Sequence, residues 1–146
     1  MFNNILVVCM GNICRSPTAE RILQHLLPER HITSAGLAVE RSRLSGSPAD
    51  ATACQVAQEH GMTLEGHRAQ QLTAELCHQS DLILVMEKRH INLLSEIAPA
   101  ARGKTMLLGQ WDGLREIPDP HRQSKDAFLY VFDVIEQAAN LWAKKL

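Results

Sequence analysis

The chain has 146 residues, a length typical of one domain that buries a hydrophobic core without disulfides or bound metal. Hydrophobic residues make up 45% and charged residues 21% of it, proportions that exclude disorder as the main state. The net charge of -1 lacks the basic excess of a dedicated nucleic-acid-binding protein, so we expect no nucleic-acid partner.

The pattern of apolar residues and cysteines bears on the compartment. No apolar run approaches the ~18 residues that a membrane span requires, and the apolar run near the N-terminus is too short for the core of a signal peptide. We therefore expect a cytoplasmic protein that does not insert into a membrane. Thiols in the cytoplasm are reduced, so we expect the four cysteines to serve in chemistry or packing rather than in structural disulfides. They are Cys9, Cys14, Cys54 and Cys77.

The hydrophobic pattern predicts strands and helices that alternate along the chain. A β-branched apolar run at residues 5–9 predicts a buried strand. Apolar residues at helical spacing after Ser16-Pro17 predict a helix that ends before Pro28. In chain order, we then expect a strand at 31–38, a loop at 41–48, helices at 49–60 and 72–79, a strand at 81–86, a helix at 87–98, a strand at 104–108, a loop at 109–120 and a helix at 125–144.

This alternation indicates βαβ units. We therefore expect a single α/β domain over residues 1–146, with a four-stranded parallel sheet covered by helices on both faces. In such sheets, ligands bind at the carboxyl ends of the strands. The loop after the first strand lies at that edge, and we expect the loop before the last helix to join it.

The loop after the first strand carries the pattern Cys-x5-Arg-Ser, from Cys9 to Ser16. The cysteine ends a predicted buried strand, and the arginine precedes a helix start. Gly11 and Asn12 tolerate the left-handed backbone that a tight loop requires. Inward backbone N–H groups and the helix N-terminus would form an anion nest that favours a Cys9 thiolate. Arg15 would grip two oxygens of a tetrahedral oxyanion, so a phosphate monoester fits best.

Other interpretations of this loop have less support. A zinc site at Cys9 and Cys14 lacks a second pair of ligands at metal spacing, because Cys77 and His78 are adjacent. No Walker loop or dinucleotide-binding glycine pattern occurs. The remaining alternative is a cysteine that only packs beside a surface arginine, which the strand, loop and helix context disfavours.

A second candidate feature is Pro118-Asp119-Pro120, in the predicted loop before the last helix. The two prolines restrict the backbone around one carboxylate and therefore its direction. Pro-Asp-Pro alone is a common turn. Together with a thiolate nucleophile, whose leaving group needs a proton, it makes Asp119 a candidate general acid.

Over essentially its whole length, the sequence resembles the low-molecular-weight protein tyrosine phosphatases. The resemblance is strongest over residues 8–20 and extends to Ser34-Ala35-Gly36, Gly66-His67-Arg68-Ala69, Gln71 and Asp119-Pro120. Details at residues 86–90, 102–104 and 116–120 look most like the bacterial subgroup paired with tyrosine autokinases of capsule and exopolysaccharide export.

The resemblance implies a protein-tyrosine-phosphatase that forms a phosphocysteine intermediate and needs no metal or other cofactor. Cys9 would be the nucleophile, Arg15 the phosphate clamp and Asp119 the general acid. The substrate would be a tyrosine-phosphorylated protein, namely a membrane tyrosine autokinase, and the enzyme would be a monomer. The phosphate-binding residues would be Met10, Gly11, Asn12, Ile13, Cys14 and Arg15.

The resemblance also assigns supporting roles. Ser16 would hydrogen-bond the Cys9 sulfur, and Asn12, Ser34 and His67 would hold the loop in shape. Cys14 matches the family's second loop cysteine, which can pair with the nucleophile in a redox response.

Two departures from the family concern the substrate pocket. His121 stands where the family usually has an aromatic residue after Asp-Pro, and residues 40–46 lack the tryptophan that some eukaryotic members carry. We therefore expect the pocket wall to consist of Met10, Ile13, Leu44 and His121.

Three other functions are open on the same residues. Thioredoxin-coupled arsenate reduction needs two further redox cysteines, but residues 82–146 contain none. Protein arginine phosphatases tend to carry threonine where Ile13 stands. A catalytically dead phosphate-binding module is disfavoured because Cys9, Arg15 and Asp119 are all retained.

Overall fold

The computed structural model of the protein describes residues 2–146. One parallel sheet of four strands lies at its centre, as expected from the sequence, and the strands follow the order β2-β1-β3-β4. The strands are β1 (Asn4–Cys9), β2 (His31–Gly36), β3 (Leu82–Val85) and β4 (Thr105–Leu107).

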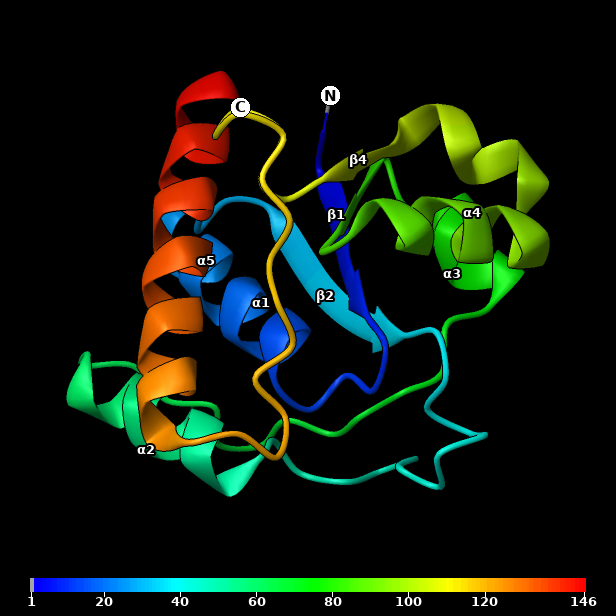
Figure 1. The fold of residues 1–146 in the computed structure, drawn as a ribbon. Coiled ribbons are helices and arrows are strands. Elements are labelled where there is room, and N and C mark those ends of the chain that lie inside the picture. Colours follow the sequence, from blue (N-terminus) through cyan, green and yellow to red (C-terminus); the bar gives the residue numbers. More distant parts are fainter. Residues whose placement is uncertain (1) are drawn as a thin grey trace.

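Helices cover both faces of the sheet, which confirms the predicted α/β architecture (Figure 1). One face carries α1, α2 and α5, and the other carries α3, α4 and the 3₁₀ helix η1. The helices are α1 (Arg15–Leu26), α2 (Ala51–Glu59), α3 (Ala74–Gln79), α4 (Lys88–Ile97), η1 (Pro99–Lys104) and α5 (Lys125–Lys145).

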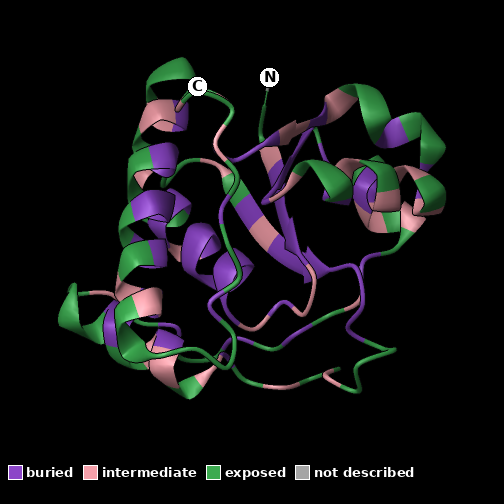
Figure 2. Ribbon diagram, viewed as in Figure 1, coloured by how far each residue is buried: buried purple, intermediate pink, exposed green. Residues whose placement is uncertain are grey.

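Strand β1 is buried on both sides, and this explains its uninterrupted apolar sequence (Figure 2). Successive side chains of a strand point to opposite faces. Ile5 and Val7 belong to the apolar core under α1, α2 and α5, whereas Leu6 and Val8 belong to the core under α3 and α4. The central strand therefore fixes the position of the loop that follows it.

Several predicted elements end earlier or begin later in the structure, for local reasons. Strand β2 ends at Gly36, although the N–H groups of Leu37 and Ala38 still donate to the carbonyls of Cys9 and Met10, each at 2.9 Å. Helix α3 begins only at Ala74, since the Thr73 side chain caps it by accepting from the Leu76 N–H.

Two further boundaries differ from the prediction. Helix α2 begins after Asp50, whose side chain accepts from the N–H groups of Thr52 and Ala53 as an N-cap. Helix η1 was not predicted, although Pro99 suits a first helical turn.

The strand order creates a crevice at the carboxyl ends of β1 and β3. The chain passes from β1 to β2 on one side, and later returns to β3 on the other side of β1. Such a switch point is where α/β sheets bind ligands. Residues 10–14 follow β1 there, and Glu87 lies just beyond β3. Within residues 2–146, no helix combines the length and the apolar character needed to cross a membrane.

Candidate active site

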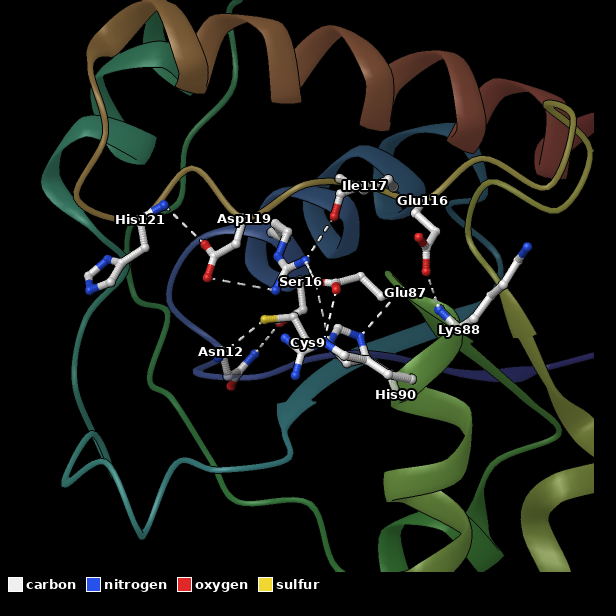
Figure 3. Close-up of polar contacts among 12 residues, drawn as sticks. Cys9, Asn12, Ser16, Glu87, Lys88, His90, Glu116, Ile117, Asp119 and His121 are labelled. Atoms are coloured by element: carbon white, nitrogen blue, oxygen red, sulfur yellow. Dashed lines mark hydrogen bonds and ion pairs between the residues drawn. The ribbon is translucent and has the colours of Figure 1, made fainter.

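Cys9 ends β1 and lies at the base of the crevice, with 3% of its surface exposed. Its Sγ lies 3.0 Å from the Ser16 Oγ and accepts from the Asn12 backbone N–H at 3.3 Å (Figure 3). Two hydrogen-bonding groups therefore converge on the sulfur, and Ser16 contacts it as the sequence suggested. Both groups can donate to the sulfur, and a cysteine acts as a nucleophile in its thiolate form.

Asn12 holds the loop in its unusual shape. It has a φ of 57°, in the left-handed region, and no exposed surface. Its side-chain amide donates to Ser16 Oγ at 2.7 Å and Ser34 Oγ at 3.0 Å, while its Oδ1 accepts from the Gln70 N–H at 3.0 Å. The His67 Nε2 lies 2.6 Å from the Asn12 carbonyl oxygen. The structure thus brings together the residues named as loop supports.

The glycines of the site act by their small size. Gly11 does not have a positive φ, and the left-handed position of the loop is Asn12. A Cβ on Gly11 would lie 3.1 Å from the Leu44 Cδ1. A Cβ on Gly36 would lie 2.6 Å from the Met10 carbonyl oxygen and 3.0 Å from the Asn12 nitrogen. Strand β2 therefore approaches the loop so closely that a larger residue at position 36 would displace the loop.

Arg15 begins α1 and is 2% exposed. Its guanidinium donates to Glu87 Oε2 at 2.6 Å and to the Ile117 carbonyl at 2.8 Å, and it lies 3.9 Å from Asp119 Oδ2. Two of its N–H donors are thus anchored by the N-cap residue of α4 and by the loop before α5. The guanidinium is held in one orientation at the edge of the pocket.

Glu87 is a residue of this site that the sequence analysis missed. Burial raises the pKa of its carboxyl, but hydrogen bonds from Arg89 and Arg15 outweigh burial and hold that pKa below its usual range. Glu87 is therefore ionised and pairs with Arg15. A signal did exist, since an acidic residue directly after a buried parallel strand lies at the ligand-binding edge.

His90 lies behind Glu87 and has no exposed surface. Its Nδ1 accepts from the Glu87 backbone N–H at 3.2 Å, so Nε2 carries the proton. Nε2 is 3.6 Å from Glu87 Oε2 and has no hydrogen-bond partner among the described residues. Burial, aided by the Arg15 charge, lowers the pKa of His90 to about 4. The ring is therefore neutral near pH 7 and packs against the carboxylate that holds Arg15.

Asp119 reaches the pocket from the opposite loop, where its side chain is 48% exposed. Its Oδ1 accepts from the His121 backbone N–H at 3.0 Å. The loop is tied to β3 by the Ile117 N–H, which donates to the Met86 carbonyl at 2.9 Å. The Asp119 carboxylate thus stands over the crevice on an anchored but exposed segment.

The residues enclose a pocket of about 310 Å³. Every residue expected to bind phosphate or to form the pocket wall contributes to it, and Ser42 and Arg122 were not expected. The lining residues are Cys9, Met10, Gly11, Asn12, Ile13, Cys14, Arg15, Ser42, Leu44, Asp119, His121 and Arg122. The pocket can therefore present a thiol, a guanidinium and a carboxylate to one tetrahedral anion.

Cys14 is a free, buried cysteine at the N-cap position of α1. Burial raises the pKa of its thiol far above the usual range, and the Asp50 charge adds to the effect. Cys14 is thus a protonated thiol near neutral pH.

A pocket of this kind, with cysteine, arginine and aspartate around one anion seat, defines a cysteine-dependent phosphatase. The model of the family described as low molecular weight phosphotyrosine protein phosphatase matches residues 4–146, and the chain belongs to this family.

Individual relatives agree with this assignment. The low molecular weight protein-tyrosine-phosphatase Wzb of Escherichia coli (strain K12) is 56% identical over 146 residues, covering 100% of this chain and 97% of that protein. The solved structure of Vibrio vulnificus Wzb in complex with benzylphosphonate is 61% identical, with a TM-score of 0.99 and full coverage of both chains. The YwlE arginine phosphatase from Geobacillus stearothermophilus is 31% identical, with a TM-score of 0.86, over 97% of this chain and 91% of that one.

Proposed function

We propose that the chain hydrolyses phosphotyrosine in proteins through a phosphocysteine on Cys9. The observation that carries this proposal is the position of the Cys9 sulfur, at the base of a pocket whose rim carries Arg15 and Asp119. Membership of the family and the tyrosine phosphatase named at 56% identity support it.

The first step transfers the phosphoryl group to sulfur. The Cys9 thiolate attacks phosphorus in line, a P–S bond forms, and the P–O bond to the tyrosine oxygen breaks. Asp119 donates its proton to the leaving oxygen, so tyrosine departs as a neutral phenol. Arg15 and the loop N–H groups carry the charge of the equatorial oxygens.

The second step releases phosphate. Water attacks phosphorus and the P–S bond breaks, so the Cys9 thiolate is regenerated. Asp119, now ionised, accepts a proton from that water and returns to its starting state. Ser16 donates to the leaving sulfur, which lies 3.0 Å from its oxygen.

The depth of the pocket favours an aryl phosphate over an alkyl phosphate. The sulfur is buried, and the apolar side chains of Met10, Ile13 and Leu44 line the way to it. A tyrosine ring places its phosphate far from the peptide backbone, whereas serine phosphate stays close to it. The Vibrio vulnificus relative in complex with benzylphosphonate, a phosphonate on a benzyl group, supports this preference.

The proposed physiological substrate is a membrane tyrosine autokinase of capsule or exopolysaccharide export, and the proposed enzyme is a cytoplasmic monomer. The support is the resemblance at residues 86–90, 102–104 and 116–120 to the bacterial subgroup paired with such kinases. We further propose that Cys14 protects the nucleophile by forming a disulfide with it under oxidation.

The experiment that tests the proposed reaction compares phosphate release from phosphotyrosine, phosphoserine and phosphoarginine peptides of one sequence. We expect kcat/KM to be highest for phosphotyrosine by a wide margin. Equal or faster hydrolysis of phosphoarginine would overturn the proposal in favour of the activity named for YwlE. No turnover of any of the three would indicate a phosphate-binding module.

A further inference from the structure

A cluster of possible metal ligands lies at the edge of the pocket, and none of its side chains takes part in the bond-making steps of the proposed reaction. Cys14 comes from the loop after β1, Asp50 from the start of α2 and His121 from the loop before α5. One ligand atom from each, the sulfur, a carboxylate oxygen and a ring nitrogen, lies within 4.8 Å of the other two. Three elements distant in sequence therefore converge on one point.

The backbone holds two of these residues in place. The Asp50 N–H donates to the Ile13 carbonyl at 2.8 Å, which fixes the start of α2 against the residue before Cys14. The Asp50 Oδ1 accepts from the N–H groups of Thr52 and Ala53 at 2.8 Å and 3.0 Å, so the cap of α2 uses only one of the two carboxylate oxygens.

The third residue lies on a segment that packs against the same place. A small cavity of about 10 Å³ is lined by Cys14, by Ala53 of α2 and by Pro120, the neighbour of His121. The His121 side chain is exposed, and its ring makes no hydrogen bond within residues 2–146. The ring is therefore free to turn toward the other two ligands.

The surrounding charges favour a cation. The Asp50 carboxylate lies in the cluster, with its ligand atom within 4.8 Å of those of Cys14 and His121. A divalent cation at this point would offset the negative charge of Asp50. It would also stabilise the Cys14 sulfur as a thiolate, the form that binds metals.

We propose that Cys14, Asp50 and His121 form a zinc site at the rim of the pocket, and that zinc bound there inhibits the enzyme. Sulfur, imidazole nitrogen and carboxylate oxygen are the donors that Zn²⁺ prefers, and three protein ligands leave one position open. Ligand bonds of about 2.0–2.3 Å place tetrahedral ligand atoms roughly 3.3–3.8 Å apart. The ligand atoms of the cluster lie within 4.8 Å of one another, so the cluster needs to contract by about an ångström when it binds zinc.

Occupation of this site has two consequences at the pocket. Zinc would tie the loop that carries Asp119 to the phosphate loop, because His121 and Cys14 belong to those two segments. It would also withdraw Cys14 from any disulfide with Cys9. The inhibitory effect rests on the proposed phosphatase function, whereas metal binding does not.

Cobalt binding in a Cys9→Ser protein tests the site without the nucleophile. Co²⁺ replaces Zn²⁺ in such sites and gives strong absorption when bound to a thiolate. We expect that absorption in Cys9→Ser, its loss when Cys14→Ser is added, and its displacement by Zn²⁺ but not Mg²⁺. Absence of a thiolate band, or a band that survives Cys14→Ser, would overturn the site.

The other two ligands have matched controls. Asp50→Asn keeps the cap of α2, since asparagine caps as well as aspartate. We expect Asp50→Asn and His121→Gln to lower cobalt affinity by roughly 10–100-fold or more. Cys54→Ser and His78→Gln, which lie outside the cluster, should leave it unchanged. Unchanged affinity in His121→Gln would contradict the assignment.

Phosphatase assays in buffered Zn²⁺ test the inhibition. We expect the wild-type rate to fall with Zn²⁺ and to recover with a chelator, while His121→Gln, measured against its own metal-free rate, needs about tenfold more Zn²⁺. Equal sensitivity of the two would place the inhibitory metal on Cys9 and overturn the regulatory role. If the wild-type protein is inactive even without zinc, the proposed phosphatase function is wrong. The cobalt experiment would still decide separately whether the metal site exists.

Discussion

The two loops that meet at the pocket are built differently. In the loop after β1, Asn12 is fully buried and its side chain makes hydrogen bonds to Ser16, Ser34 and Gln70. In the loop before α5, the Asp119 side chain is 48% exposed, accepts from the His121 backbone N–H and lies 3.9 Å from the Arg15 guanidinium. The nucleophile is thus held rigidly in the fold, while the carboxylate is delivered from a surface segment. Substitutions in the first loop should damage every reaction, and those in the second only the reactions that need its proton.

The largest effect is expected from Cys9→Ser. A serine hydroxyl in the same place is a poor nucleophile, so kcat should fall on the order of 10⁴-fold or more. The fold and phosphate binding should persist, because the hydrogen bond from the Asn12 side chain to Ser34, which supports the loop, does not involve Cys9. Steady-state kinetics and phosphate titration measure the two properties separately. Cys54→Ser, outside the pocket, is the control, and substantial turnover by Cys9→Ser would refute the nucleophile.

Asp119→Asn should slow the reaction selectively. Tyrosine leaves with a parent pKa of about 10, so loss of the acid should cost roughly 10²–10⁴ in kcat/KM for phenols of this kind. The kcat/KM for nitrophenyl phosphate, which has a better leaving group, should fall much less. The measurement is kcat/KM, which reports phosphoryl transfer to Cys9 and excludes the later water step, against leaving-group pKa for both proteins. An equal loss for all leaving groups would make Asp119 a residue that only positions its loop, with His121 the next candidate acid.

The positions of the two loops and of their main side chains could be predicted from the sequence, because they depend on local sequence patterns. The continuous apolar run at 5–9 marks a strand buried on both faces, and Cys9, Arg15 and Asp119 stand in short motifs. The pairing of Glu87 with Arg15 could not be predicted in this way, since it joins residues that are 72 positions apart. The same holds for the cluster of Cys14, Asp50 and His121, which exists only once three elements have packed together.

Glu87→Gln tests whether Arg15, at the end of the rigid loop, needs support from the N-cap of α4. Glutamine keeps a hydrogen-bond acceptor but removes the charge that pairs with Arg15 at 2.6 Å. A charged hydrogen bond contributes about 1.5–3 kcal/mol, so kcat/KM should fall roughly 10–100-fold, with weaker inhibition by inorganic phosphate. Glu116→Gln, which removes a nearby exposed carboxylate, should have little effect. An equal fall in kcat/KM in both variants would indicate that any nearby negative charge has this effect, and would contradict a specific role of Glu87 in positioning Arg15.

His90 should make stability depend on pH. Its pKa is lowered to about 4 in the folded protein, whereas an unfolded histidine titrates near 6.5. Between these values the unfolded chain binds more protons, so the free energy of unfolding should decrease as pH falls, on the order of 1–3 kcal/mol in total. Urea unfolding at pH 7 and pH 5 measures this. The decrease should be smaller in His90→Gln and unchanged in His78→Gln; a steeper decrease in His90→Gln would contradict the assignment.

The smallest effect is expected from Cys14→Ser under oxidation. Peroxide converts the Cys9 thiolate to a sulfenic acid, which can condense with the Cys14 thiol to a disulfide and release water. Wild-type activity should therefore recover with a dithiol reductant after peroxide treatment. Recovery should be lower in Cys14→Ser, because over-oxidation of Cys9 is not prevented. Equal recovery in both proteins would count against a protective role for Cys14.

The central claim is that the phosphoryl group is transferred to the Cys9 sulfur before it reaches water. Trapping this phosphocysteine intermediate tests the claim most directly. Asp119→Asn should slow the water step, so the phosphoenzyme should accumulate during turnover of nitrophenyl phosphate. Rapid denaturation followed by ³¹P NMR and peptide mapping would locate it. The account predicts a thiophosphate ester on Cys9, absent in Cys9→Ser. Phosphate bound to a histidine such as His121, or no covalent phosphate while turnover proceeds, would contradict it.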